Sequence, residues 1–296
     1  MPPARARRLV AVLLSAAMIG GLVWVSDWDA LGRALRGGGP GLVLVAAGLY
    51  LANGVLKAYR WWLLLGAAGV RESPLRAYRA FLTGMAVNNL LPTGFAGEPV
   101  RLARLESRIT PDGIAATAAD RALDVLALAV AAAVGIPLLA GLDPDTVPAV
   151  AAAAGLSLAA VVAAGGWIWR RGRLASLARS PGASAGAVLL TVLIQVNDPV
   201  RLMLLAAAYD LDLGFWRSVG IVAISTVGGT VAMLGGGAGM ALSVGALLAA
   251  AGSPAESAAA VGLVFVATSV WLSFPLGALA TLVGRRVPRA AEARWT

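Results

Sequence analysis

Long apolar runs alternate with short polar or basic segments along the chain. An apolar run of about 20 residues is enough to cross the hydrocarbon core of a bilayer as a helix. The pattern predicts spans at about residues 9–25, 41–65, 113–140, 147–169, 184–208 and 258–283, and two more apolar segments that end in broken stretches near Pro92 and Gly236. We therefore predict an all-α polytopic membrane protein with about 6–8 transmembrane helices.

The most unusual stretch is residues 88–101, which interrupts apolar sequence on both sides with Pro92, Gly94, Gly97 and Pro99. It also places a carboxylate, Glu98, three residues before Arg101. Non-helical backbone at membrane depth is tolerated only where it is buried in protein or lines a water-filled cavity. This stretch is therefore a candidate site.

Composition supports one integral membrane domain over residues 1–296. Apolar residues make up 59% of the chain and charged residues 13%, and the mean hydropathy is +0.81. The net charge of +9 is almost entirely arginine, which points to anionic lipid and phosphate as partners and not to nucleic acid. Because cysteine and histidine are both absent, disulfides, thiol nucleophiles and imidazole catalysis are excluded.

Two halves of the chain resemble each other. Blocks that begin at Arg60, Leu75 and Leu91 match blocks that begin at Arg201, Phe215 and Leu234. We predict repeat A at about 41–140 and repeat B at about 184–283. If the segments around Pro92 and Gly236 are re-entrant, most basic loops fall on one side of the membrane, which favours an inverted repeat.

Ionisable residues inside a predicted span are costly and usually face the bundle interior. Asp120, Arg121 and Asp124 lie within one span, and Asp198 and Arg201 lie within another, where Pro199 is expected to open the helix. Two interpretations stay open for these residues. They form structural ion pairs that lock helices together, or they line a cavity that holds a charged headgroup.

Two other features have a structural and a functional interpretation. The cluster Lys57, Tyr59, Arg60, Trp61 and Trp62 is typical of an interfacial belt of aromatic and basic residues. The glycines at 235–239 allow close helix packing. Their match to the stretch around Pro92 makes Gly235, Gly236 and Gly237 site candidates as well.

These motifs resemble a known family. The residues that carry the resemblance are Arg60-Trp61-Trp62, Asn88-Asn89-Leu90-Leu91-Pro92, Gly94, Gly97-Glu98, Arg101 and Asp120-Arg121, with support from the glycines near 235 and from Pro254 and Glu256. Over about residues 41–283 the chain is similar to the lysylphosphatidylglycerol synthase transmembrane family, the flippase-like domains of multiple peptide resistance factors and their stand-alone relatives.

The resemblance implies a multi-pass protein of a bacterial or archaeal cytoplasmic membrane that moves a lipid between leaflets. Carried over by position, the functional residues would be Asn89, Pro92, Gly97, Glu98, Arg101, Asp120 and Arg121. The sequence departs from the family pattern in two ways. It carries no soluble aminoacyltransferase domain, so we do not expect it to make lysyl-lipid. It also has Met240-Ala241-Leu242-Ser243 where an acidic residue is expected.

We therefore expect a lipid translocase, without a cofactor, for an anionic or aminoacylated phospholipid or a polyprenyl-linked lipid. The predicted substrate-binding residues are Asn88, Asn89, Pro92, Gly94, Gly97, Glu98, Arg101, Asp120, Arg121, Asp124, Asp198, Arg201, Gly235, Gly236 and Gly237. No metal-ligating or catalytic residue is predicted. The alternatives are an intramembrane transferase acting on lipid phosphates and a membrane module that partners a lipid-modifying synthase.

Overall fold

The architecture is given by a computed structural model, which describes residues 28–90, 96–105, 109–135, 180–231 and 238–283, together with Leu13. The predicted spans at 9–25 and 147–169 lie outside these residues. So do five candidate site residues, Pro92, Gly94, Gly235, Gly236 and Gly237. The described residues form helices and no strand, as predicted for an all-α membrane protein.

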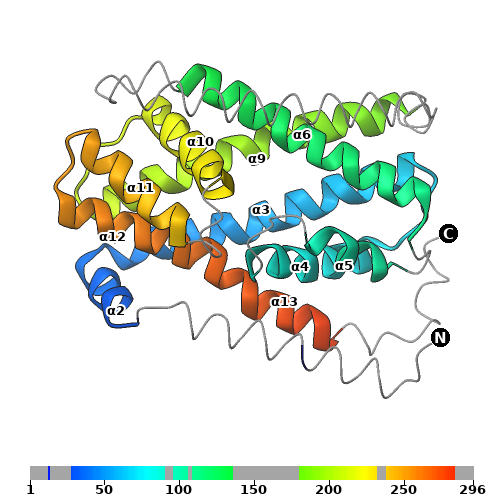
Figure 1. Ribbon diagram of the computed structural model, residues 1–296, viewed down its shortest axis with the longest axis horizontal. Helices are drawn as coiled ribbons and strands as arrows, with labels where there is room; N and C mark the ends of the chain where they lie inside the picture. Colours follow the sequence, from blue (N-terminus) through cyan, green and yellow to red (C-terminus); the bar gives the residue numbers. More distant parts are fainter. Residues whose placement is uncertain are drawn as a thin grey trace.

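Among the described residues, four long helical segments run across the molecule (Figure 1). They are α3 (Pro40–Ala67), α6 (Pro111–Gly135), α9 (Pro181–Ala208) and a last span of α12 (Ala255–Val266), η2 (Ala267–Trp271) and α13 (Leu272–Val283). The first three begin with proline, whose missing N–H is not needed in the first turn. α3, α9 and the last span are long and apolar enough to cross a membrane. The chain is a polytopic membrane protein.

Two pairs of shorter helices enter the molecule from opposite ends. α4 (Pro74–Leu90) and α5 (Gly97–Ala103) lie side by side, and so do α10 (Phe215–Val231) and α11 (Ala238–Ala250). In Figure 1 the outer ends of α4 and α5 lie at the right, and those of α10 and α11 lie at the left. Each pair therefore has the arrangement that a re-entrant hairpin requires, and the two hairpins open in opposite directions.

The centre of the molecule is the contact between α3 and α9, which pack against each other over much of their length. Ala46 of α3 and Ala187 of α9 are buried at this contact. Small side chains here let the two backbones approach closely. Close approach lets α9 side chains reach backbone oxygens of α3: Asn197 Nδ2 donates to the Leu49 carbonyl at 3.1 Å.

The last span changes its winding before a proline. Pro275 has no N–H to donate to the carbonyl of Trp271, one turn earlier. The five residues that end at Trp271 form the π-helical turn η2. Insertions of this kind are typical of functional regions of helices, and η2 contributes Thr268 to a buried arginine centre described below.

One helix, α2 (Trp28–Gly37), was not predicted from the sequence. It follows the first apolar run, is amphipathic and packs against α12. Tyr209, just after α9, donates a hydrogen bond from its hydroxyl to the carbonyl of Ala34. Burial of that hydroxyl raises the pKa of Tyr209. A short amphipathic helix gives no signal in a search for long apolar spans.

Candidate functional site

Six charged side chains from three helices form a closed ring of ion pairs, which we call the charge ring: Arg60 of α3, Glu98 and Arg101 of α5, and Asp120, Arg121 and Asp124 of α6. Cations and anions alternate around it, so each residue pairs with two residues of opposite sign. With three arginines and three carboxylates, its formal net charge is zero.

One side of the charge ring is buried. Asp120 accepts hydrogen bonds from Arg60 Nε at 2.8 Å and from Arg101 Nη2 at 3.1 Å. The guanidinium of Arg101 also lies 4.5 Å from the ring centre of Trp61, which favours a cation–π contact. The side chains of Arg60, Arg101 and Asp120 are at most 2% exposed. This side therefore joins α3, α5 and α6, as the structural interpretation of these ion pairs expected.

The other side of the ring is open. The side chains of Arg121 and Asp124 are 33% and 28% exposed, and Glu98 is 13% exposed. Arg121 Nε donates to Glu98 Oε1 at 2.8 Å. The link from Arg121 Nη1 to Asp124 Oδ2 is the longest in the ring, at 3.5 Å. These three residues are the part of the charge ring that a ligand can reach.

The interfacial-belt interpretation is wrong for two residues. Arg60 and Trp61 are fully buried. Arg60 has two carboxylates of α6 to pair with, and its Nη1 also donates to Thr191 Oγ1 of α9 at 3.0 Å. The indole N–H of Trp61 donates to Thr117 at 3.1 Å. One sequence signal could have indicated that Arg60 is buried. In the predicted repeat it matches Arg201, which lies within a predicted span.

The predicted site residues at the tip of α4 hold the hairpin together. Asn88 Oδ1 accepts from the backbone N–H of Gly97 at 2.6 Å, and Asn88 Nδ2 donates to Glu98 Oε1 at 3.2 Å. The first bond satisfies an N–H of the first turn of α5, as a helix cap does. Asn89 Nδ2 donates to Ser273 Oγ of α13 at 2.9 Å. Asn88 thus positions Glu98 and α5, and Asn89 ties the end of α4 to α13.

Another buried arginine, Arg201 of α9, lies outside the charge ring and has its own polar partners. Its Nη1 pairs with Asp198 at 2.6 Å, and its Nε donates to the Ala46 carbonyl at 3.1 Å. Its Nη2 donates to Thr268 Oγ1 of η2 at 3.2 Å. The prediction that Pro199 opens this helix is wrong, because α9 continues through it to Ala208. The pair at 198 and 201 is therefore carried on an intact helix.

Arg60 and Arg201 make reciprocal contacts across α3 and α9. Arg60 of α3 reaches Thr191 of α9. Arg201 of α9 lies 5.0 Å from the ring centre of Tyr50 on α3. From Arg60 to Arg201 is 141 residues, and from Tyr50 to Thr191 is the same. Such exchange of equivalent partners is what a two-fold relation between two segments produces.

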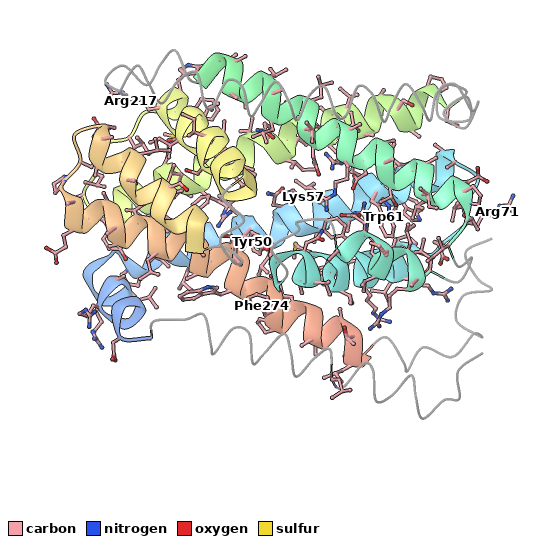
Figure 2. All side chains as sticks on the ribbon, in the orientation of Figure 1. Tyr50, Lys57, Trp61, Arg71, Arg217 and Phe274 are labelled. Carbon is pink, nitrogen blue, oxygen red and sulfur yellow. The ribbon has the colours of Figure 1, made fainter. Side chains whose placement is uncertain are left out.

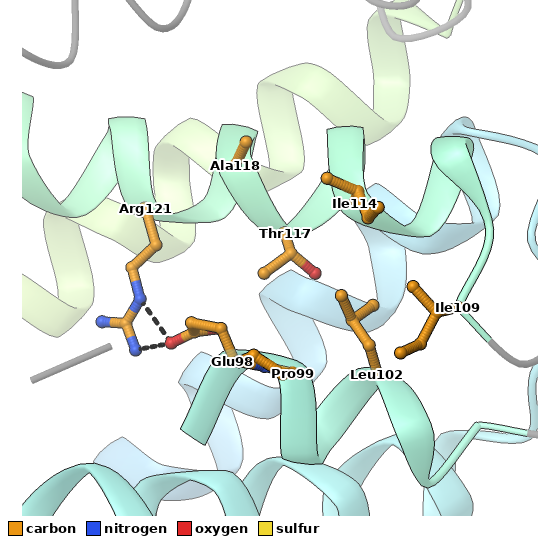
Figure 3. Close-up of a pocket in the computed structure, with 8 residues that line it drawn as sticks. All are labelled: Glu98, Pro99, Leu102, Ile109, Ile114, Thr117, Ala118 and Arg121. Atoms are coloured by element: carbon orange, nitrogen blue, oxygen red, sulfur yellow. Dashed lines mark hydrogen bonds and ion pairs between the residues drawn. The ribbon is translucent and has the colours of Figure 1, made fainter. Parts of the chain in front are cut away.

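An apolar groove leads to the open side of the charge ring (Figure 3). It has a volume of about 320 Å³, and its lining residues come from α5, α6 and the segment between them: Glu98, Pro99, Leu102, Ile109, Ile114, Thr117, Ala118 and Arg121. Figure 3 shows Ile109 at one end of this row and the Glu98–Arg121 ion pair at the other. The volume is within the range of small-molecule sites.

Within the described ranges, no three His, Cys, Asp or Glu side chains are grouped so that they could hold a metal ion. The described site offers guanidinium groups, carboxylates and an apolar groove. This chemistry can bind and position a charged amphiphile.

The comparisons with known proteins identify the family of the chain. No curated protein matches the chain. The family model described as the lysylphosphatidylglycerol synthase TM region matches residues 8–277, which include α2 to η2 and the first half of α13. This family associates the chain with lipid modification or flipping in membranes. The chain belongs to the lysylphosphatidylglycerol synthase transmembrane family.

Proposed function

We propose that the protein is a lipid translocase of the cytoplasmic membrane, which moves an anionic or aminoacylated phospholipid or a polyprenyl-linked lipid between leaflets. The observation that carries the proposal is the half-open charge ring at the inner end of an apolar groove. A lipid has the same two parts, a charged headgroup and hydrocarbon chains. A translocase must offer both environments side by side and needs no reacting group.

The roles within the charge ring follow from burial. Arg101 is 2% exposed and is held by Glu98 and Asp120, so it supports the site and does not meet the lipid in this conformation. Arg121 is the accessible cation. We infer that Arg121 binds the phosphate, and that Glu98 or Asp124 accepts an amino group where the lipid carries one.

The arrangement of the helices supports an inverted repeat as the framework for translocation. α3 and α9 are both 28 residues long and start 141 residues apart, at Pro40 and Pro181. α4 and α10 are both 17 residues long and start at Pro74 and Phe215, the same distance apart. Transporters of this type place their substrate site where the two halves meet, and the charge ring touches the other half through the contact of Arg60 with Thr191 of α9.

Leaflet exchange in proteoliposomes tests the proposal. The panel contains labelled phosphatidylglycerol, its lysyl ester, a polyprenyl phosphate and uncharged diacylglycerol. We expect selective exchange of one phosphate-bearing class and a loss of about tenfold or more in Arg121→Gln, because a charge-assisted hydrogen bond is removed. The matched control is Arg217→Gln, an exposed arginine at the end of the molecule opposite Arg71 (Figure 2).

Either of two results would refute the proposal. One is folded protein that exchanges no lipid of the panel. The other is exchange that Arg121→Gln leaves at the wild-type rate. Product formation from a lipid phosphate by the purified protein would instead support a transferase.

A further inference from the structure

The groove beside the charge ring lies between two helices whose backbones make little close contact. α5 packs closely against α4, and the charge ring links it to α6, but the backbones of α5 and α6 approach each other at few points. The groove occupies this weak interface, along the first three turns of α6. A gap between loosely packed helices is a place where a bound molecule can be accommodated without unfolding either helix.

The wall of the groove is apolar and open to the surroundings of the protein. Ile109 and Ile114 are 54% and 49% exposed at its outer part. Leu102 and Ala118 continue the wall inward. Thr117 is the one uncharged polar residue of the lining, and its hydroxyl already accepts a hydrogen bond from Trp61. In a membrane protein, such a surface suits hydrocarbon and not water.

The inner end of the groove is complementary to a phosphate. Arg121 carries five N–H donors, and its contacts within the charge ring use one donor on each nitrogen. Its longest contact, 3.5 Å to Asp124, is the one that a ligand displaces most easily. Arginine presents adjacent N–H groups that match two oxygens of a phosphate.

The surroundings can also balance the added negative charge. If a phosphate takes the place of Asp124 beside Arg121, Asp124 keeps its 2.6 Å contact with Arg60. Lys57, one turn before Arg60 on α3, interacts electrostatically with Asp124. The charge ring itself is neutral, and Lys57, which is not part of it, can offset the charge of a singly charged phosphate.

We propose that the α5–α6 groove holds one hydrocarbon chain of a phosphate-bearing lipid while the phosphate binds Arg121. The groove is then the lateral entry by which the lipid leaves the surrounding leaflet and reaches the charge ring. This inference rests on the proposed translocase function and adds the path and the recognised chemistry, a phosphate next to an aliphatic chain.

Photolabelling tests where the hydrocarbon chain of the bound lipid lies. Phosphatidylglycerol with a diazirine midway along one acyl chain is incorporated into vesicles with the full-length protein, and adducts are mapped by mass spectrometry. We expect adducts on the segment that contains Ile109 and Ile114. Diacylglycerol with the same photoactive chain should label this segment about tenfold less, because it lacks the phosphate. Glycerol phosphate in excess should reduce the labelling by the phospholipid.

A groove-filling substitution tests the same point by function. Ala118→Trp fills the groove, and we expect loss of both groove labelling and leaflet exchange. Ala133→Trp, on an exposed position of α6 away from the groove, should leave both unchanged. Photolabelling of the wild-type protein decides the question even if Ala118→Trp does not fold.

The outcomes separate the groove from the overall function. If the wild-type protein exchanges lipid but the groove is not labelled, the groove inference is wrong and the translocase proposal stands. If the groove is labelled selectively but no lipid is exchanged, the binding site stands and the translocase proposal is wrong. Equal labelling by diacylglycerol and phosphatidylglycerol would show that Arg121 does not recognise the phosphate of the lipid.

Discussion

At the scale of single residues, the members of the charge ring differ in how far their side chains are buried, and so in whether they stabilise the fold or are accessible to a ligand. Asp120 faces two arginines whose side chains are almost completely buried. Removing its charge leaves Arg60 and Arg101 with too little negative charge nearby, in a place where water cannot compensate. Breaking a buried ion pair in this way is strongly destabilising. Asp124, in contrast, is partly open.

We predict that Asp120→Asn lowers the free energy of unfolding by about 3–5 kcal/mol, whereas Asp124→Asn lowers it by about 1 kcal/mol or less. Denaturant unfolding of both variants in the same detergent measures the difference. Equal losses would show that the two carboxylates share one environment. Because Asp120→Asn weakens the fold, loss of transport in that variant would not by itself show that Asp120 contacts the lipid.

The sequence predicted most of these residues but not their connection. Glu98 with Arg101, and Asp120 with Arg121 and Asp124, are neighbours by helical spacing, so each group was visible alone. The closing of the ring depends on Arg60, which comes from another helix. An arginine beside two tryptophans is also typical of a membrane interface, and spacing along one helix does not distinguish the two positions.

At the scale of elements, the α4–α5 hairpin depends on a contact between two glycines. A Cβ added at Gly84 would lie 2.8 Å from the carbonyl oxygen of Gly97, and one added at Gly97 would collide with the carbonyl oxygen of Gly84. This contact lets α5 lie flat against α4. It also sets the position of Glu98, the residue that follows Gly97, and so the position of one third of the negative charge in the ring.

We predict that Gly97→Ala forces the arms of this hairpin apart, lowers stability by about 1–3 kcal/mol, and slows leaflet exchange. Gly66→Ala is the matched control, because a Cβ there meets no atom within 4 Å. In helix α3 that change should be neutral or slightly stabilising. Thermal unfolding and exchange rates of the two variants test this. A Gly97→Ala protein with wild-type stability would show that the close contact is not needed.

At the scale of the whole molecule, the two hairpins open at opposite ends and the four long spans connect those ends (Figure 1). Residues close to the outer ends of α4 and α5 should therefore share one side of the membrane. Residues at the outer ends of α10 and α11 should share the other side.

Because the chain has no cysteine, single-cysteine variants report this topology directly. We predict that Leu75→Cys and Ala103→Cys react with an impermeant thiol reagent from the cytoplasmic side, and that Trp216→Cys and Ala250→Cys react from the other side. All four positions are exposed. Reaction of Leu75→Cys and Ala103→Cys from opposite sides would mean that the segment between them crosses the membrane.

The long helices were easier to predict than their arrangement. The predicted spans at 41–65 and 184–208 correspond to α3 and α9 within a few residues, because a long apolar run between basic or glycine-rich segments defines its own ends. Amphipathic α2 was missed. The α3–α9 contact depends on buried alanines at Ala46 and Ala187, which look like any other alanine in an apolar sequence.

The neutrality of the charge ring has a consequence for the energetics of transport. The membrane potential does work of about 2.3 kcal/mol per 100 mV on each elementary charge that crosses the field. A ring of three cations and three anions that shifts as a unit carries no net charge, so the potential acts only on the lipid. Exchange of a singly anionic lipid should respond to an imposed potential, and exchange of a zwitterionic lipid should not. If the exchange rate of a zwitterionic lipid depended on the membrane potential, the six residues of the charge ring would have to separate during transport.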